Sequence, residues 1–122
     1  MSPIIKADSK SEYYFEERCY ITELLNNSSE PDLSVARARV EPGVTTALHR
    51  VLGTAEKYYI LSGTGAMEVD GQAAGTVNPG DMVLIPPGQT QRITNTGSAD
   101  LIFLCFCTPR FEPKNYEAVQ ES

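Results

Sequence analysis

The chain has 122 residues, of which 41% are hydrophobic and none is tryptophan, and its formal net charge is −6 at pH 7. This length predicts one domain with one modest core, and the acidity disfavours a nucleic-acid partner because like charges repel. No apolar run reaches the ~20 residues that a helix needs to cross a membrane, and residues 1–17 lack the apolar segment of a secretory signal. Three cysteines, an odd number, argue against a disulfide framework. We therefore expect a cytoplasmic protein that binds neither nucleic acid nor membranes.

Short apolar runs separated by turn residues predict an all-β fold. Helical periodicity is nearly absent, and the runs recur about every 8–12 residues, which is typical of a sandwich or a small barrel. After the last run, residues 108–122 begin with an extended, proline-containing segment, and we expect a short helix at their end. The predicted strands, nine or ten in number, include residues 18–25, 33–40, 46–52, 56–63, 66–70, 72–77, 82–86, 90–97 and 100–107.

Two spaced patterns lie within this series of strands. The first, over residues 43–63, reads G-x5-H-x-V-x4-E-x6-G, and the second, over residues 80–95, reads G-x5-P-x-G-x2-Q-x3-N. These patterns resemble the two motifs of the cupin family, G-x5-H-x-H-x3,4-E-x6-G and G-x5-P-x-G-x2-H-x3-N. Together with the piece between them they run from residue 43 to residue 95, and the spacing of both motifs is matched throughout.

The resemblance implies an all-β cupin barrel, a double-stranded β-helix of jelly-roll type. We expect a single cupin domain over residues 1–122, with an N-terminal strand arm at 1–16 and a C-terminal tail at 108–122. Cupins of this size usually pair through N-terminal strands that join the partner's sheet, so the resemblance also implies a homodimer. The motifs call for tight turns with positive φ at Gly63 and Gly80.

The resemblance places metal ligands at four positions, which in this chain are His49, Val51, Glu56 and Gln91. Side chains of a strand alternate between its two faces, so His49 shares a face with Val51, and Glu56 shares a face with Tyr58. If these faces point into the barrel, His49, Glu56 and Gln91 converge. An imidazole, a carboxylate and an amide oxygen can hold a divalent ion such as Zn, Mn, Fe or Ni, although more weakly than a set with a second histidine. Tyr58 is then a candidate catalytic acid/base.

The same residues also have a purely structural interpretation. A buried carboxylate needs a cation, a proton or hydrogen bonds, and a His49 bonded to Glu56 meets that need without metal. Gln91 would complete such a polar cluster, and Tyr58 would be a packed side chain with a satisfied hydroxyl.

Two more groups are candidates for chemistry. Cys105 and Cys107 share one face of an apolar strand, where paired thiols can bind a soft metal or form a reactive couple, but buried cysteine is more often a small apolar residue. Arg37 and Arg39 alternate with small residues that are expected to line the barrel, which would place both arginines on the outer face. If the parity is reversed, one arginine could instead anchor a substrate carboxylate.

Three functions follow from the residues and the resemblance. The first is a metal-supported enzyme of isomerase, cyclase or dioxygenase type that acts on a polar small molecule, with the metal on His49, Glu56 and Gln91 and with Tyr58 as acid/base. The second is a metal-free cupin that binds a small-molecule ligand without catalysis. The third is a scaffold with a vestigial pocket.

Overall fold

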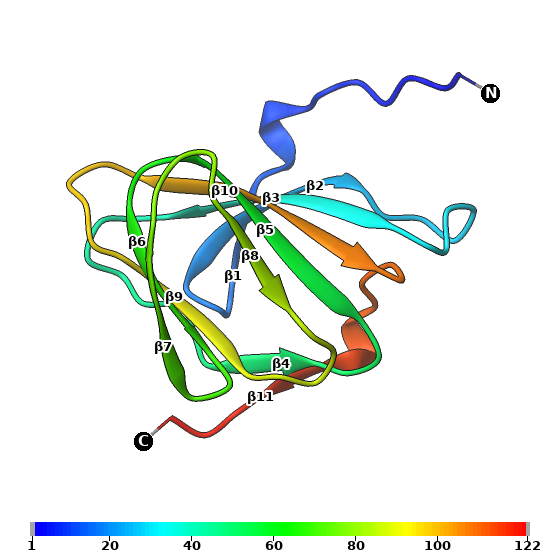
Figure 1. Ribbon diagram of the computed structural model, residues 1–122. Helices are drawn as coiled ribbons and strands as arrows, with labels where there is room; N and C mark the ends of the chain where they lie inside the picture. Colours follow the sequence, from blue (N-terminus) through cyan, green and yellow to red (C-terminus); the bar gives the residue numbers. More distant parts are fainter. Residues whose placement is uncertain (1, 122) are drawn as a thin grey trace.

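Residues 2–121 are described by the computed structural model, and they form eleven strands in two antiparallel sheets. In Figure 1 the two sheets curve around a common interior, so the all-β jelly-roll barrel expected from the sequence is confirmed. The six-stranded sheet contains, in spatial order, β1 (Tyr13–Phe15), β2 (Cys19–Leu25), β3 (Ser34–Val40), β10 (Leu101–Thr108), β5 (Ala55–Ser62) and β8 (Met82–Ile85). The five-stranded sheet contains β11 (Tyr116–Ala118), β4 (His49–Val51), β9 (Gln91–Asn95), β6 (Gly65–Val69) and β7 (Gln72–Val77).

The core lies between the inner faces of the two sheets. Alternate residues of β4, β5 and β9 are buried, as expected for strands with one face toward a core. Ile60 and Leu101 are completely buried, and Ile93 reaches the same core from the opposite sheet. Burial of these side chains, at roughly 1.5–3 kcal/mol each, is the main force that holds the sheets together.

The nine strands named from the sequence correspond to β2–β10. β1 lies within the expected N-terminal strand arm, and β11 was missed. The expected C-terminal helix is wrong: a single 3-10 turn, η2 (Pro113–Asn115), leads into β11, which pairs with β4. The reason is aromatic packing, because the Tyr116 ring lies against Phe15 and stacks on His49. The other helical element among residues 2–121 is the 3-10 turn η1 (Ser9–Ser11), and no helix is long and apolar enough to cross a membrane.

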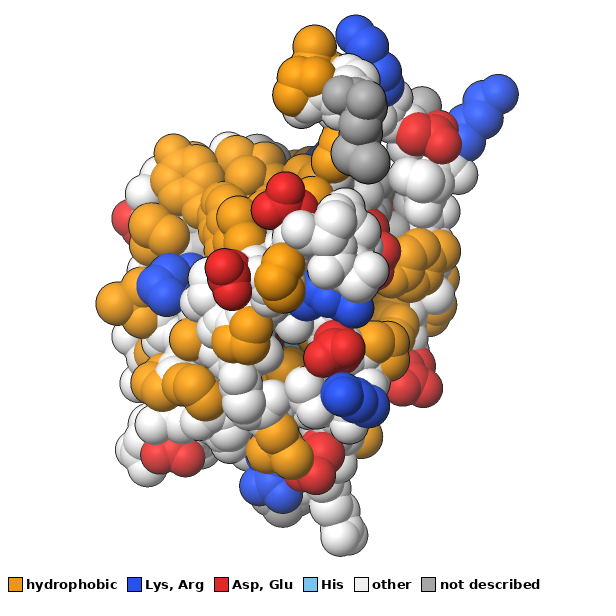
Figure 2. Space-filling model, turned by 90° about the vertical axis from the view of Figure 1, so that its right-hand side faces the viewer, with side chains coloured by type: hydrophobic (Ala, Val, Ile, Leu, Met, Phe, Trp, Pro, Cys, Tyr) orange, Lys and Arg blue, Asp and Glu red, His pale blue; other side chains and the backbone are white. Residues whose placement is uncertain are grey.

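The N-terminal arm contributes β1, which pairs with β2 of its own chain. The residues before η1 extend away from the barrel (Figure 1) and expose Ile4 and Ile5. Figure 2 shows the side of the molecule that lies to the right in Figure 1, where hydrophobic side chains are interspersed with acidic and basic ones.

The outer face of β3 carries its two arginines, as the alternation predicted. Arg39 forms ion pairs with Glu12 and Asp100, at 2.8 and 3.2 Å. Ala36 and Ala38, on the opposite face of the same strand, line the interior. Small residues inside and long charged residues outside leave open space within this half of the barrel.

The two motif glycines have the positive φ that the sequence predicted, but their surroundings differ. Gly63 has φ +87°, and a Cβ added there would lie 2.7 Å from the Asp100 carbonyl oxygen. Gly80 has φ +91°, with nothing within 4 Å of such a Cβ.

We therefore predict that Gly63→Ala costs more stability than Gly80→Ala. Both changes carry the roughly 1–2 kcal/mol penalty of a left-handed residue with a Cβ, and Gly63→Ala adds a backbone clash of about 1–3 kcal/mol. Urea unfolding of the parent and the two variants measures the difference. Equal midpoints for the two variants would contradict the close approach at Gly63.

Candidate functional site

A cavity of about 250 Å³ lies inside the barrel, between the two sheets. Its walls come mainly from β1–β5, β10 and the C-terminal segment, and much of the lining is apolar or aromatic. Four acidic residues line it, and among residues 2–121 no lysine or arginine does. Glu17 and Glu56 are the two that are partly or fully buried, whereas Glu16 and Glu23 are exposed to solvent.

Glu56 and Tyr58, on β5, meet Gln91 of β9 across the space between the two sheets. The Gln91 Nε2 donates to Glu56 Oε1 at 2.6 Å, and the Tyr58 hydroxyl donates to Gln91 Oε1. Cys105 Sγ donates to the other Glu56 oxygen at 3.0 Å. Both oxygens of the buried carboxylate therefore accept a hydrogen bond, and the directions of these bonds fix the Gln91 amide with its nitrogen toward Glu56.

Tyr58 is packed as well as hydrogen-bonded. Its ring stacks on Phe103 with 4.4 Å between the centroids. Burial raises the pKa of Tyr58 well above its usual value, and the nearby Glu56 charge acts in the same direction. Its phenol therefore stays protonated and serves as the donor to Gln91.

His49 lies at the start of β4 and is held on both sides of its ring. Its Nδ1 lies 2.8 Å from the Ala47 carbonyl oxygen, and the ring stacks on Tyr116. A carbonyl oxygen can only accept, so Nδ1 carries a proton. The Nε2 lies 3.2 Å from Glu17 Oε1, and this contact therefore contains one proton, held by either His49 or Glu17.

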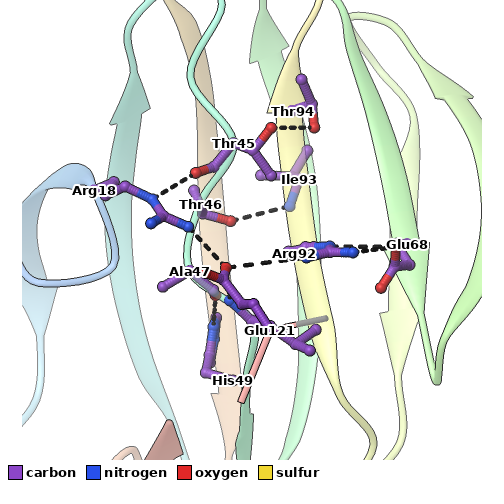
Figure 3. A network of polar contacts seen from close by, with 11 residues as sticks. Arg18, Thr45, Thr46, Ala47, His49, Glu68, Arg92, Ile93, Thr94 and Glu121 are labelled. Atoms are coloured by element: carbon purple, nitrogen blue, oxygen red, sulfur yellow. Dashed lines mark hydrogen bonds and ion pairs between the residues drawn. The ribbon is translucent and has the colours of Figure 1, made fainter. Parts of the chain in front are cut away.

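The segment before His49 is fixed by a network that Figure 3 shows. Glu121, near the C-terminus, accepts from Arg18 at 2.7 Å and from the Leu48 backbone N–H at 3.1 Å. The Thr46 hydroxyl accepts from the Ile93 backbone N–H at 3.0 Å. These contacts set where the chain enters β4, and so where the imidazole points.

Glu17 is the functional candidate that sequence reasoning missed. It lies in the turn between β1 and β2, outside both motifs, and no signal in its neighbourhood distinguishes it from the other acidic residues of the arm. Burial raises the pKa of Glu17 to about 7, with His49 opposing the shift and Glu56 adding to it. Its backbone carbonyl also accepts from the Ala47 N–H at 2.8 Å, which ties this turn to the segment before β4.

The predicted metal ligands are all buried in the barrel, but their free atoms do not meet at one point. The Gln91 oxygen accepts from Tyr58, its nitrogen faces Glu56, and the His49 Nε2 faces Glu17. Val51 is buried and offers no ligand atom. His49, Glu56 and Gln91 stay a predicted ligand set, which a divalent ion could use only if these side chains exchanged their present partners. The alternative prediction that His49 bonds to Glu56 is wrong, because Glu17 takes that place.

The two thiols of β10 lie beside this polar cluster. The Cys105 and Cys107 sulfurs are 4.0 Å apart, and one ligand atom from each of Glu56, Cys105 and Cys107 lies within 4.8 Å of the others. The hydrogen bond with Cys107 and burial both raise the pKa of Cys105 well above its usual value. Both cysteines line the cavity, as does Cys19.

Comparisons with known proteins agree with this architecture. The solved structure of the Streptomyces nucleoside dehydratase Pac13 matches with a TM-score of 0.78 at 18% identity, over 96% of this chain and 92% of that one. At this identity the likeness shows the fold alone.

Sequence relatives support the same family. The uncharacterized protein MJ1618 of Methanocaldococcus jannaschii is 32% identical over 115 residues, which are 93% of this chain and 91% of that protein. The oxalate-binding protein of Thermotoga maritima is 38% identical over 69 residues, or 57% of this chain and 56% of that protein. A family model described as a cupin domain matches residues 36–107, more than half of the chain. The chain therefore belongs to the cupin family, as its two spaced motifs predicted.

Proposed function

We propose that this cupin binds a small polar organic molecule, neutral or cationic, in the cavity of its barrel. The observation that carries the proposal is the charge of the lining, with four carboxylates and, among residues 2–121, no lysine or arginine. His49 is the one histidine of the chain, so the lining can supply at most one positive charge. Such a cavity repels anions and favours amines, or hydroxyl groups that donate hydrogen bonds to carboxylates.

The size of the cavity limits the ligand further. Pockets for drug-sized molecules have volumes of about 300–1,000 Å³, and this cavity has about 250 Å³. The ligand is therefore smaller than a typical drug. Phe103 and Phe111 supply apolar wall in the same cavity, so a molecule with both polar groups and a carbon-rich part fits best.

The relative that binds oxalate supports small-molecule binding by this type of barrel, but not oxalate itself as the ligand here. A dianion in this cavity would lie among four acidic lining residues, without a lysine or arginine from residues 2–121 to pair with it. Binding would therefore cost desolvation energy that no ion pair offsets.

The Glu17–His49 pair favours a second candidate function, which is proton transfer on the bound molecule in an isomerisation or a cyclisation. Both side chains line the cavity, 3.2 Å apart, and they share one proton. A carboxyl and an imidazole in contact can take a proton from one carbon or oxygen of a substrate and return it at another. Tyr58 stays a predicted catalytic residue, although its proton is directed toward Gln91.

The predicted test of ligand class is a thermal-shift panel on metal-free protein. Some of the small polyols, sugars and amines should raise the melting temperature by several degrees. A ligand at 100 times its Kd stabilises the folded protein by about 2.7 kcal/mol. Oxalate and other small dicarboxylates should leave it unchanged. Ala36→Leu fills the cavity and should abolish the shift, whereas Arg37→Leu, on the outer face of the same strand, should keep it.

A shift by dicarboxylates alone would contradict the proposed ligand class. A shift that survives Ala36→Leu would place the ligand outside the cavity.

The pH dependence of stability tests the Glu17 environment. The pKa of Glu17 rises from its usual 4.5 to about 7 in the folded protein. A raised carboxyl pKa means that the folded state holds the proton more tightly, so this contribution is full below about pH 4.5 and is lost as pH rises through 7. Relative to Glu17→Gln, the parent should lose up to roughly 3 kcal/mol of unfolding free energy over that window.

Urea unfolding at several pH values between about 4.5 and 8 measures this difference. His49, Glu16 and Glu56, the other charged groups that affect Glu17, are present in both proteins and cancel in the comparison. Glu30→Gln, a change at an exposed carboxyl that neither lines the cavity nor affects Glu17, is the control and should keep the parent's profile. Parallel profiles for the parent and Glu17→Gln would show that the Glu17 carboxyl is not buried.

We also propose that the protein is a homodimer that pairs through its N-terminal arm. β1 is the last strand of the six-stranded sheet, so its outer edge is available to a strand from a second copy. Ile4, Ile5 and Tyr14 are exposed on and before this strand. Covering these apolar side chains with a second copy would stabilise the pair.

Deletion of residues 2–8 should therefore convert the dimer to a monomer in sedimentation velocity, while β1 and the cavity stay intact. Leu84→Glu is the control and should remain dimeric, because Leu84 is an exposed residue of β8, at the other edge of the sheet. A monomeric parent would overturn the proposal. So would a dimer that dissociates in Leu84→Glu but survives the deletion, because the arm would then not be the interface.

A further inference from the structure

Three potential metal ligands meet on neighbouring strands through the register of the sheet. Cys107 of β10 lies directly opposite Glu56 of β5, and Cys105 lies opposite Tyr58, one step further along the same inward face. Because residues two apart on a strand share a face, both thiols point to the side of the Glu56 carboxylate. Neither cysteine belongs to the cupin motifs.

The distances suit a tetrahedral ion after small shifts. Zn–S and Zn–O bonds of about 2.3 and 2.1 Å place two sulfurs ~3.8 Å apart and a sulfur and an oxygen ~3.6 Å apart. Here the two sulfurs are 4.0 Å apart, and Cys105 Sγ lies 3.0 Å from Glu56 Oε2. A cation bound to Cys105 Sγ and Glu56 Oε2 would replace the proton of the hydrogen bond between these two atoms.

The carboxylate is already oriented for this role. Gln91 donates to Glu56 Oε1 and so holds the other oxygen, Oε2, toward the thiols. A hydrogen bond from outside the ligand set fixes ligand direction at many metal sites. Gln91 therefore supports a metal at Glu56 without binding it.

The surroundings also favour a cation. Glu56, Cys105 and Cys107 line the cavity, so an ion can enter from it and keep an open position toward it. Four acidic residues, Glu56 among them, line the same space and no lysine or arginine of residues 2–121 does, which favours a positive charge there. Among residues 2–121, Glu56, Cys105 and Cys107 form the one group of three histidine, cysteine or acidic residues whose ligand atoms all lie within 4.8 Å of one another.

We propose that Glu56, Cys105 and Cys107 form a binding site for a thiol-preferring divalent cation, of which Zn²⁺ is the commonest, with water or a cavity ligand in the fourth position. Two thiolates and a carboxylate suit Zn²⁺ better than the hard ions Mg²⁺ or Ca²⁺. The site shares only Glu56 with the family's ligand positions. It does not depend on the proposed organic ligand, which rests on the charge of the whole cavity.

Binding must release the protons that the thiols carry. Each of Cys105 and Cys107 forms a metal–sulfur bond as its S–H bond breaks, and the protons pass to the buffer. With an ionised Glu56, one Zn²⁺ therefore releases about two protons. No oxidant or reductant takes part.

The test is titration of the metal-free, reduced protein with Zn²⁺ and with Co²⁺ as a spectroscopic probe. One equivalent of Co²⁺ should give a thiolate-to-cobalt charge-transfer band in the near-ultraviolet, which one equivalent of Zn²⁺ should remove. Cys105→Ser and Cys107→Ser should each weaken binding at least about tenfold and reduce the band. Cys19→Ser, which changes the third cavity thiol, is the matched control and should keep both.

Absence of the band in the parent, or its loss in Cys19→Ser alone, would overturn the assignment. So would metal binding that His49→Gln abolishes while both β10 variants keep it, because the ion would then occupy the family's positions. Circular dichroism verifies that each serine variant is folded. If a serine variant does not fold, thiol alkylation of the parent takes its place. Protection of two thiols when Zn²⁺ is present supports the site, and equal alkylation with and without Zn²⁺ contradicts it.

Discussion

The polar interior of the barrel is organised by one buried amide that joins its two sheets. Gln91 reaches from the five-stranded sheet and takes part in two hydrogen bonds with β5, one to Glu56 and one from Tyr58. A buried carboxylate left without partners would cost several kcal/mol, and one lost partner costs about 1–3 kcal/mol. Among residues 2–121 every buried side-chain nitrogen and oxygen has a hydrogen-bond partner. Where cupin motifs place a histidine, this chain therefore has an amide that satisfies Glu56 without an ion.

This substitution separates the polar groups of the cavity into two sets. Glu56 is committed to Gln91 and Cys105, while His49 is free to pair with Glu17 from the β1–β2 turn. The first set lies beside the thiols of β10 and suits a soft cation. The second, the contact between His49 and Glu17, lines the cavity in which we propose that an organic ligand binds. One barrel interior can thus support ion binding and small-molecule binding with largely different residues.

The fold was predictable because its signals are local. Strand alternation, turn glycines and the two motifs placed nine strands, and the parity of β3 correctly set its arginines outside and its alanines inside. The C-terminal end was not predictable, since β11 exists because Tyr116 packs on Phe15 and His49, contacts far apart in sequence. That His49, Glu56 and Gln91 face the interior was readable from parity, but the partner of His49 was not. Glu17 reaches it only through the register of β1 and β2, which no motif records.

The measurement that tests this account most directly is side-chain proton exchange in the metal-free protein, followed by nuclear magnetic resonance at neutral pH. If Gln91 joins the sheets as described, its amide protons exchange slowly and the Tyr58 hydroxyl proton gives a resolved signal, because both are buried and bonded. Their signals should also show contacts to each other across the two sheets. Rapid exchange of the Gln91 amide, like that of an exposed side chain, would contradict the account, since Glu56 would then lack the partner that replaces a metal.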